Sequence, residues 1–442
     1  MEERKATVTH VERRAREDLI SELPNSLISQ ILSYLPTKEA VRTSVLSNRW
    51  KSLWLLISGL DVGSYMFPDY KAFVSFVDRL LGFCREEKSC LHKLKLSIHN
   101  DVTDHSCVTR WIDFVATRKL RNLDVECLLV RPEFLKLMMP LSLYVCETLL
   151  HLRLRRVSLR SLESVSLPRL KTMCLEHNVY ANDACLQLLI SSCPLLEDLS
   201  IVRGVDDYVK VLRVHSQSLA SLSIKYTLFS SDIENSAVLI EAPRLKYLNF
   251  EDDMNSNKTI SNSGSLTKVN LLGSFFMSGS LTKMRDFFTS ISGVKDMNIS
   301  WGTFRFIEIL MAVVPLPQFC NLSCLEAELQ VFGSLAKFLE LFPSLRSLVL
   351  ELKQFGENHQ LVLLSSVPEC LRSSLEFVEL KTPVRGADAE TKLIKYLLEN
   401  SAVLKKFKLR LGCKSVDEES TILMELMTLR RCSASCEVFC ST

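Results

Sequence analysis

The chain has 442 residues, with 54 basic and 51 acidic side chains and a formal net charge of +3. So balanced a charge does not favour a dedicated nucleic-acid binder. No apolar run approaches the roughly 18 residues that a membrane-spanning helix needs. The 15 cysteines contain no CxxC pair, so we expect reduced thiols in an intracellular protein of the cytoplasm or nucleus.

Residues 1–17 are dominated by charged side chains, and we expect a flexible basic tail. The run Arg13-Arg14-Ala15-Arg16 fits a fragment of a nuclear-targeting signal or simply a solvated tail.

Residues 18–62 predict three short helices. Pro24 suits a first helical turn, Pro36 ends that helix, and Ser47 would begin a third helix. The apolar stripe of these helices is wider than so small a bundle can cover. It would either bind a partner or dock on the following segment as a cap, and spacing alone does not choose between the two.

A short pattern, apolar-x-x-apolar-x-apolar, then recurs thirteen times between Leu91 and Leu409, at a mean period of about 26 residues. The last two apolar positions of each unit are two apart, which is the alternation of a strand. One short strand cannot bury its apolar face alone, so neighbouring units must stack. The pattern predicts an α/β leucine-rich-repeat solenoid shaped like a horseshoe.

Several segments between these strands have the spacing of amphipathic helices. They are residues 71–84, 183–192, 281–288, 335–341 and 388–399. The Ser/Asn-rich stretch at residues 255–265 predicts a surface loop.

The N-terminal segment resembles the F-box over about 40 residues in register. The residues that carry the resemblance are Leu23-Pro24, Ile31-Leu32, Leu35-Pro36, Ser44-Val45-Leu46-Ser47 and Arg49-Trp50. The phrase Ser191-Ser192-Cys193-Pro194, followed by Leu195-Leu196-Glu197-Asp198-Leu199, resembles the repeats of plant F-box proteins with leucine-rich repeats and an FBD domain. Ser366-Val367-Pro368-Glu369-Cys370-Leu371 and the helix ending at Asn400 are similar to the FBD domain. We therefore expect an F-box at 18–62, repeats at 63–356, and an FBD module at 357–442 that continues the repeat.

The resemblance implies a substrate-recognition subunit of a cullin–RING (SCF-type) ubiquitin ligase. The F-box would bind a Skp-type adaptor, and through it the cullin and RING proteins, by packing helices into an apolar groove. Residues expected to contact the adaptor are Leu23, Pro24, Ile28, Ile31, Leu32, Leu35, Pro36, Leu46, Trp50 and Trp54, although some of them must form the module's own core.

The repeats would hold the protein substrate on the concave face of the sheet. Residues on either side of the last apolar position of each unit should point out of that face. They predict a basic rung at Arg153 and Arg155 and an acidic stretch at Glu326, Glu328 and Glu351. The acidic stretch would help to select a substrate with basic residues, or it is simply a solvated strand face.

No catalytic motif appears: the sequence lacks HExxH, GxSxG, a Walker A loop and GxGxxG. Cys432, Cys436 and Cys440 lie four apart but have no fourth ligand nearby, so we expect no metal site. We expect no cofactor, no nucleic acid and no membrane partner, and no enzyme activity of the chain's own. The alternative function is an F-box repeat scaffold that binds proteins without directing ubiquitin transfer.

Overall fold

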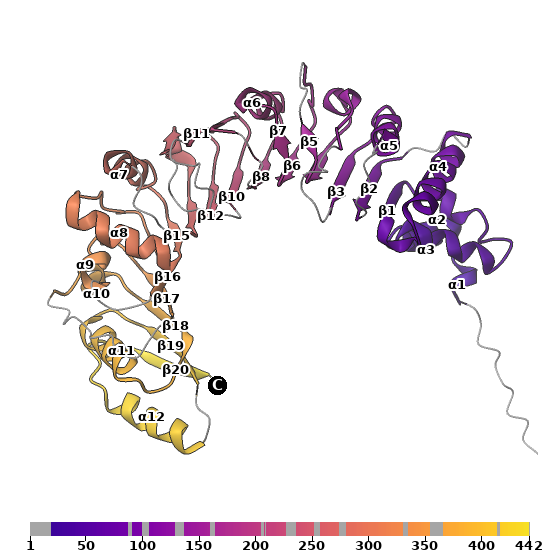
Figure 1. Ribbon diagram of the computed structural model, residues 1–442. Coiled ribbons are helices and arrows are strands. Elements are labelled where there is room, and N and C mark those ends of the chain that lie inside the picture. Colours follow the sequence, from indigo (N-terminus) through magenta and orange to yellow (C-terminus); the bar gives the residue numbers. More distant parts are fainter. Residues whose placement is uncertain are drawn as a thin grey trace, which may run out of the picture.

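The computed structural model describes residues 19–86, 91–99, 106–128, 137–159, 164–204, 207, 209–226, 236–251, 257–273, 280–329, 335–353, 366–412 and 416–441. Within them, a small helical module is followed by one sheet of fifteen strands that bends into an arc (Figure 1). The sheet follows chain order, and neighbouring strands are parallel. The helical module lies at one end of the arc and the C-terminal strand at the other (Figure 1).

The strands of the main sheet lie on the inner side of the arc (Figure 1). They are β1 (Gly59–Gly63), β2 (Lys93–Ile98), β3 (Asn122–Cys127), β4 (His151–Arg155), β6 (Thr172–Glu176), β8 (Asp198–Arg203), β10 (Ser221–Tyr226), β12 (Tyr247–Glu251), β14 (Lys268–Leu271), β15 (Asp296–Ile299), β16 (Cys324–Leu329), β17 (Ser347–Leu352), β18 (Phe377–Val384), β19 (Lys406–Leu411) and β20 (Glu437–Ser441).

Every one of the thirteen repeat units contributes its last two apolar positions to one of these strands, and all of these side chains are buried. The units stack in register, so that Leu222 of β10 lies between Leu199 of β8 and Leu248 of β12. Burial of one such side chain stabilises the fold by about 1.5–3 kcal/mol. Because no single unit encloses its own core, stacking is what makes the repeated pattern stable.

Two strands at the ends of the sheet were not predicted from the sequence pattern. β1 belongs to a unit made of Ile57, Leu60 and Val62, which lies before the first repeat that we recognised. In β20 the pattern is degenerate, because Ser435 stands at the first apolar position and Cys440 at the last. The sheet therefore extends one strand further at each end than the repeats alone predict.

Helices lie along the outer side of the arc (Figure 1). They are α4 (Tyr70–Glu86), α5 (Ser106–Ala116), α6 (Asp183–Ser191), α7 (Leu281–Ser290), α8 (Trp301–Val313), α9 (Leu335–Leu339), α10 (Glu369–Ser373), α11 (Asp388–Asn400) and α12 (Val416–Thr428). Short 3₁₀ turns are η3 (Ser64–Met66), η5 (Leu141–Val145) and η7 (Ser263–Ser265). The five helices predicted between strands are confirmed, with ends that differ from the prediction by at most two residues.

In the middle of the arc, outer strands replace helices, which the alternation of strand and helix did not predict. β9 (Val211–His215), β11 (Ala237–Glu241) and β13 (Asn257–Ser261) form a parallel three-stranded sheet, and β5 (Ser158–Leu159) pairs with β7 (Val179–Tyr180). β9 and β11 alternate buried and exposed positions and contain β-branched residues, which favours strands over helices.

The loop predicted at residues 255–265 is wrong in part, because it contains β13. Ile260 is buried, and the side chain of Lys258 is also buried, with its ammonium 5.3 Å from the centre of the Phe250 ring. Pairing with β11 satisfies the backbone polar groups of this polar stretch, so tertiary contacts outweigh its local preference for a loop.

The N-terminal module contains α1 (Leu19–Glu22), α2 (Asn25–Leu32) and α3 (Thr37–Arg42), followed by the 3₁₀ turns η1 (Thr43–Val45) and η2 (Leu53–Leu56). The third helix predicted from Ser47 is not formed. The residues after Ser47 form turns instead, followed by the 3₁₀ turn η2. The Arg49 side chain explains this local structure: its Nε donates to Asn25 Oδ1 at 3.0 Å, and its Nη2 donates to the Leu23 carbonyl. These bonds tie the turn to the start of α2.

The module is docked on the first strands of the sheet. The Asp61 backbone N–H donates to Thr37 Oγ1 at 2.8 Å, so Thr37 holds β1 against α3. The Lys38 ammonium donates to the Met66 carbonyl and lies 4.5 Å from the centre of the Phe67 ring. Trp54 packs against the cores of both the module and the repeats. In the described part of the chain, no helix is long and apolar enough to cross a membrane.

Candidate functional site

The helix α2 is apolar on two sides. One side carries Ile28 and Leu32, which are buried with Ala40, Trp50, Leu53 and Ile57 in the module's small core. The other side carries Leu27 and Ile31, which are 45% and 47% exposed. A helix that is apolar on both sides needs a second surface to cover the exposed side. This exposed side is therefore a candidate docking surface.

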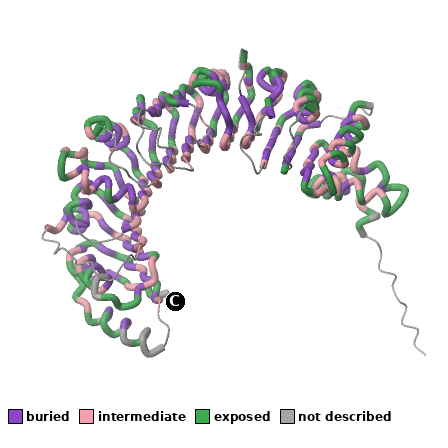
Figure 2. Tube along the Cα trace, viewed as in Figure 1, coloured by how far each residue is buried: buried purple, intermediate pink, exposed green. Residues whose placement is uncertain are grey.

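Further apolar side chains of the module are exposed, and Figure 2 shows how much of the module lies open to solvent. They are Tyr34, Leu35, Val45 and Leu46, of which Val45 is 86% exposed. Together with Leu27 and Ile31 we call these residues the apolar helical face. Isolated exposed leucines are ordinary on protein surfaces, whereas several exposed apolar side chains in one small module are typical of an interface.

The ten residues predicted to contact an adaptor divide into three groups. Ile28, Leu32 and Trp50 are buried in the module's core, so they support the surface from within. Leu23, Pro36 and Trp54 are half-buried. Pro24, Ile31, Leu35 and Leu46 are exposed. The prediction had not included Leu27, Tyr34 and Val45, although the spacing of Leu27, Ile31 and Leu35, each four apart, could have identified the first of them.

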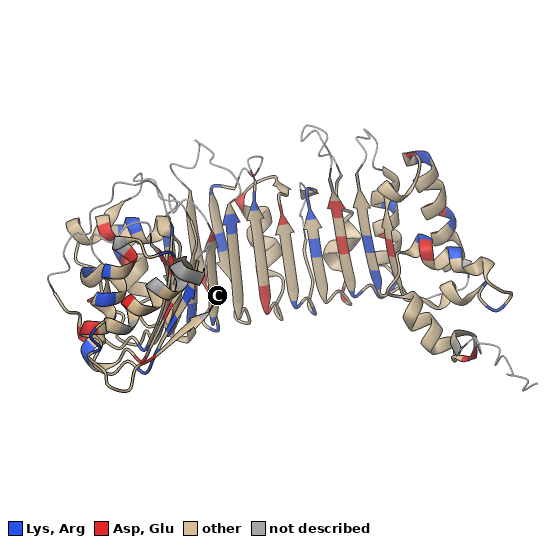
Figure 3. Cartoon of the chain, turned by 90° about the horizontal axis from the view of Figure 1, so that it is seen from below, with Lys and Arg blue, Asp and Glu red and all other residues tan. Residues whose placement is uncertain are grey.

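The inner face of the sheet is a second candidate surface. The residues on either side of each unit's last apolar position align across the strands, as in the row Asp124, Arg153 and Cys174. Most are half-buried, and in places a strand with acidic side chains lies beside a strand with basic ones (Figure 3). Because parallel neighbours lie about 4.8 Å apart, such charges can pair across strands.

The predicted basic rung at Arg153 and Arg155 is matched by carboxylates. Arg153 Nε lies 3.0 Å from Glu176 Oε1, and its Nη1 lies 3.6 Å from Asp124 Oδ2. Arg155 pairs with Glu126 through Nη1 and with Glu176 Oε2 through Nε at 3.3 Å. This rung is therefore an ion-pair network rather than an excess of positive charge.

Burial and pairing act in opposite directions on the acids of this network. Burial raises the pKa of Asp124, although Arg153 and Lys95 oppose that shift. Burial also tends to raise the pKa of Glu176, but hydrogen bonds from Arg153 and Cys174 together with the charges of Arg153 and Arg155 outweigh it, and the net shift is downward. Glu176 is thus held ionised at neutral pH.

The acidic stretch is paired in the same way. Glu326 binds the Lys381 ammonium, while Lys353 Nζ lies 2.8 Å from Glu351 Oε1 and 3.4 Å from Glu328 Oε1. The hydrogen bonds to Glu351 and Glu326 raise the pKa values of Lys353 and Lys381 respectively. Three carboxylates and two ammonium groups leave this stretch one negative charge in excess.

Between these two charged regions, the central row consists of uncharged polar side chains. They are Ser200, Ser223, Asn249, Asn270 and Asn298 on β8, β10, β12, β14 and β15. Asn249 Nδ2 donates to Ser223 Oγ at 3.0 Å, and Asn270 Nδ2 donates to the Tyr247 hydroxyl at 2.9 Å. We call this row the amide row.

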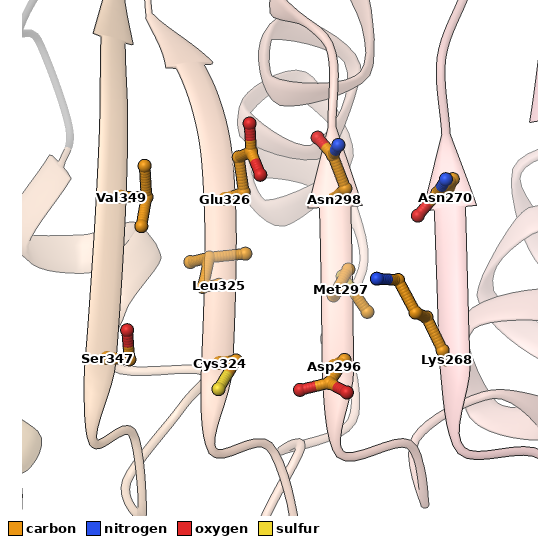
Figure 4. A pocket seen from close by; sticks show the side chains of 10 residues that line it. All are labelled: Lys268, Asn270, Asp296, Met297, Asn298, Cys324, Leu325, Glu326, Ser347 and Val349. Carbon is orange, nitrogen blue, oxygen red and sulfur yellow. The ribbon is translucent and has the colours of Figure 1, made fainter. Parts of the chain in front are cut away.

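A hollow of about 230 Å³ lies at the end of the amide row, over β14 to β17 (Figure 4). Its lining consists of Lys268, Asn270, Asp296, Met297, Asn298, Cys324, Leu325, Glu326, Ser347 and Val349. A second hollow of about 280 Å³ lies over β2 to β6 and includes Asp124 and Arg153. Burial and the nearby Asp296 raise the pKa of the Cys324 thiol, so this cysteine is held protonated.

Among the described residues, no group of three or more His, Cys, Asp or Glu side chains is placed to hold a metal ion. The described cysteines, which include Cys432, Cys436 and Cys440, are free thiols. The surfaces described above have the chemistry of protein binding: an apolar patch at one end, and a polar, half-buried sheet face along the arc.

Comparison with known protein families finds three matches along the chain, in the order F-box, leucine-rich repeats and FBD domain. The F-box domain matches residues 20–58, the leucine-rich repeats of the FBD-associated F-box protein At5g56370 match residues 108–350, and the FBD domain matches residues 364–409. None of these three is an enzyme domain. The class of protein is thus an F-box protein with repeats.

Proteins that match almost the whole length of the chain identify the family within this class. The FBD-associated F-box protein At5g22730 of Arabidopsis thaliana is 52% identical over 96% of this chain and 94% of its own length. The F-box/FBD/LRR-repeat protein At5g22660 of the same plant is 43% identical over 96% of this chain and 97% of its own length. The chain belongs to the family of FBD-associated F-box proteins with leucine-rich repeats, which confirms the resemblance seen in the sequence.

Proposed function

We propose that this chain is the substrate-recognition subunit of an SCF-type cullin–RING ubiquitin ligase. The apolar helical face would bind a Skp-type adaptor, and the sheet, as the inner side of a horseshoe-shaped repeat solenoid, would bind the protein to be ubiquitinated. The observation that carries the proposal is the exposed apolar side of α2 in a module that matches the F-box.

In this function the chain itself would catalyse no step. Its contribution would be proximity, because a substrate held on the sheet is kept near a ubiquitin-transfer enzyme bound elsewhere in the complex. The contacts of Thr37 with β1 and of Lys38 with the turn η3 that follows β1 support this role, since they join the adaptor-binding module to the repeats. The proposed setting is inside the cell, in the cytoplasm or the nucleus.

The boundaries of the parts follow from the same proposal. We propose an N-terminal tail at 1–17, an F-box from residue 18, repeats to about residue 356, and an FBD module at 357–442. The tail lies outside the described residues. Because β1 belongs to the main sheet and the F-box match ends at residue 58, we place the end of the F-box before Gly59 rather than at residue 62.

The direct test is co-purification of the tagged full-length chain with a Skp-type adaptor. Wild type should bring down adaptor and cullin, whereas the double variant Leu35→Ala/Pro36→Ala should lose at least tenfold of the adaptor signal, because it removes adjacent apolar anchors. Leu195→Ala is the matched control, since Leu195 is an exposed leucine on a repeat.

Thermal unfolding followed by circular dichroism must first show that all three proteins are folded. Equal adaptor recovery from wild type and the double variant would contradict the proposed docking surface. Adaptor binding without cullin recruitment or ubiquitin transfer would favour the alternative, a scaffold that binds proteins without directing ubiquitination.

A further inference from the structure

The lining of the hollow over β14 to β17 contains a polar group whose hydrogen bonding is incomplete. Asn270 Oδ1 is buried and has no hydrogen-bond partner, although the Nδ2 of the same amide donates to Tyr247. A buried acceptor without a donor is costly, so a ligand that donates a hydrogen bond at this point gains more than one at the open surface.

The neighbouring amide offers the complementary group. Figure 4 shows the Asn270 oxygen and the Asn298 nitrogen facing each other from adjacent strands, β14 and β15. The described contacts include no hydrogen bond between these two side chains. An acceptor and a donor therefore lie side by side in the lining of the hollow.

A carboxamide fits this pair of groups. It carries N–H donors and a carbonyl acceptor in one plane, so one carboxamide could donate to Asn270 Oδ1 and accept from Asn298 Nδ2. A hydroxyl is a poorer match, because its donor and acceptor share one oxygen atom and do not meet both groups as the separate nitrogen and oxygen of an amide do. A charged side chain placed directly on these two amides is also disfavoured, because the amides carry no charge to compensate its desolvation.

Lys268 adds a preference for a nearby negative charge. It is exposed at the edge of the hollow, directly across from Asp296 of β15, and the ion pairs found among the described residues do not include one between its ammonium and a carboxylate. The other basic residues of this part of the face are matched: Lys225 lies 2.6 Å from Glu251, and Lys381 binds Glu326. Of the acids in the hollow, Glu326 is neutralised in this way, and the Asp296 carboxylate faces the Cys324 thiol.

We propose that this hollow is a subsite for an asparagine or glutamine side chain of the bound protein, with an acidic residue close to it in sequence that pairs with Lys268. The inference rests on the proposed function, because it takes the ligand to be a segment of a protein. It assigns the specificity to the uncharged centre of the sheet, since the charged rungs on both sides are occupied by their own partners.

The test uses the purified full-length chain and fluorescein-labelled nine-residue peptides in a Gly/Ser background, with Kd measured by fluorescence anisotropy. The first peptide carries Gln-Gln-Glu at its centre. The others replace both glutamines by alanine, both by serine, or the glutamate by lysine. The Gln-Gln-Glu peptide should bind at least fivefold more tightly than each of the others.

Variants locate the site. Asn270→Ala should weaken the Gln-Gln-Glu peptide roughly fivefold, the loss expected of one hydrogen bond, and leave the alanine peptide unchanged. Lys268→Gln should abolish the preference for glutamate over lysine. Lys93→Gln is the matched control, because Lys93 is an exposed lysine in the corresponding row of β2. Asn298→Ala provides a second variant if Asn270→Ala does not fold.

Any of three results would overturn the proposal. The glutamine and alanine peptides bind equally, no peptide binds at 1 mM, or the preference for the Gln-Gln-Glu peptide persists in both Asn270→Ala and Lys268→Gln. Tighter binding of the lysine peptide would overturn it in favour of selection by the acidic stretch. Adaptor co-purification is measured on the same variants. If adaptor binding is intact while the peptide preference fails, the proposed function stands without this subsite.

Discussion

The N-terminal module and the curved sheet treat their apolar side chains differently. The repeats bury theirs almost completely, and their exposed inner face is polar and largely paired with itself. The module has a core of only six residues and leaves Leu27, Ile31 and Leu46 open to solvent. The same residue type, leucine, is therefore structural in one region and available for binding in the other.

The comparison teaches that burial, rather than residue type, separates the two roles. Stacked repeats supply each other with a covering surface, so their leucines are covered from both sides. The module is too small to cover both sides of α2. Its exposed apolar side chains lower the solubility of the free protein. A partner that covers them removes this apolar surface from water.

The largest expected effect compares one leucine from each region. Leu222→Ala on β10 should lower the free energy of unfolding by about 2–5 kcal/mol, because it leaves a cavity in a fully buried site. Leu46→Ala, at a side chain that is 65% exposed, should change it by less than about 0.5 kcal/mol. Urea unfolding followed by circular dichroism measures both. A large loss from Leu46→Ala would place that residue in a core and remove it from the docking surface.

A smaller effect concerns the ion pairs on the sheet and depends on pH. The pKa of Glu176 is shifted downward in the folded chain. Its contribution to stability is therefore present above its ordinary pKa of 4.5 and is lost as the pH falls through the lower folded value. Glu176→Gln should cost about 1–2 kcal/mol at pH 7, since Glu176 accepts charge-assisted hydrogen bonds.

Unfolding temperatures of wild type and Glu176→Gln measured between pH 7 and pH 3.5 check this expectation. The difference between the two proteins should shrink toward the acidic end. Glu425→Gln, on an exposed position of α12, is the control and should show little difference at any pH. A difference that does not change with pH would mean that packing, and not ionisation, accounts for the loss.

The smallest expected effect on stability comes from the acidic stretch. Glu326→Lys/Glu328→Lys removes the partner of Lys381 and one of the two partners of Lys353, at a cost of about 1 kcal/mol because these pairs are partly exposed. If the stretch selects basic substrates, proteins that co-purify with the full-length chain should change, whereas Glu425→Lys should leave them unaltered. An unchanged set of bound proteins would remove the acidic stretch from the substrate site.

Much of the fold followed from the spacing of apolar residues. The thirteen repeat strands and five helices were predictable, because stacking requires the same apolar positions in every unit. The strand β20 was not predictable, since Ser435 and Cys440 break the pattern and only pairing with β19 defines the strand. β13 was missed for a similar reason, because a polar segment becomes a strand only beside β11.

For the surfaces, the sequence by itself determined which residues could take part, and tertiary structure decided which of them do. Periodicity placed Ile28 and Ile31 on one helix, but only packing against Trp50 and Leu53 decided that the first is core and the second exposed. Spacing put Arg153 and Glu326 on the inner face, but their charges are neutralised by residues from other strands. Charge pairing depends on distances across the sheet, and these distances exist only once the repeats have stacked.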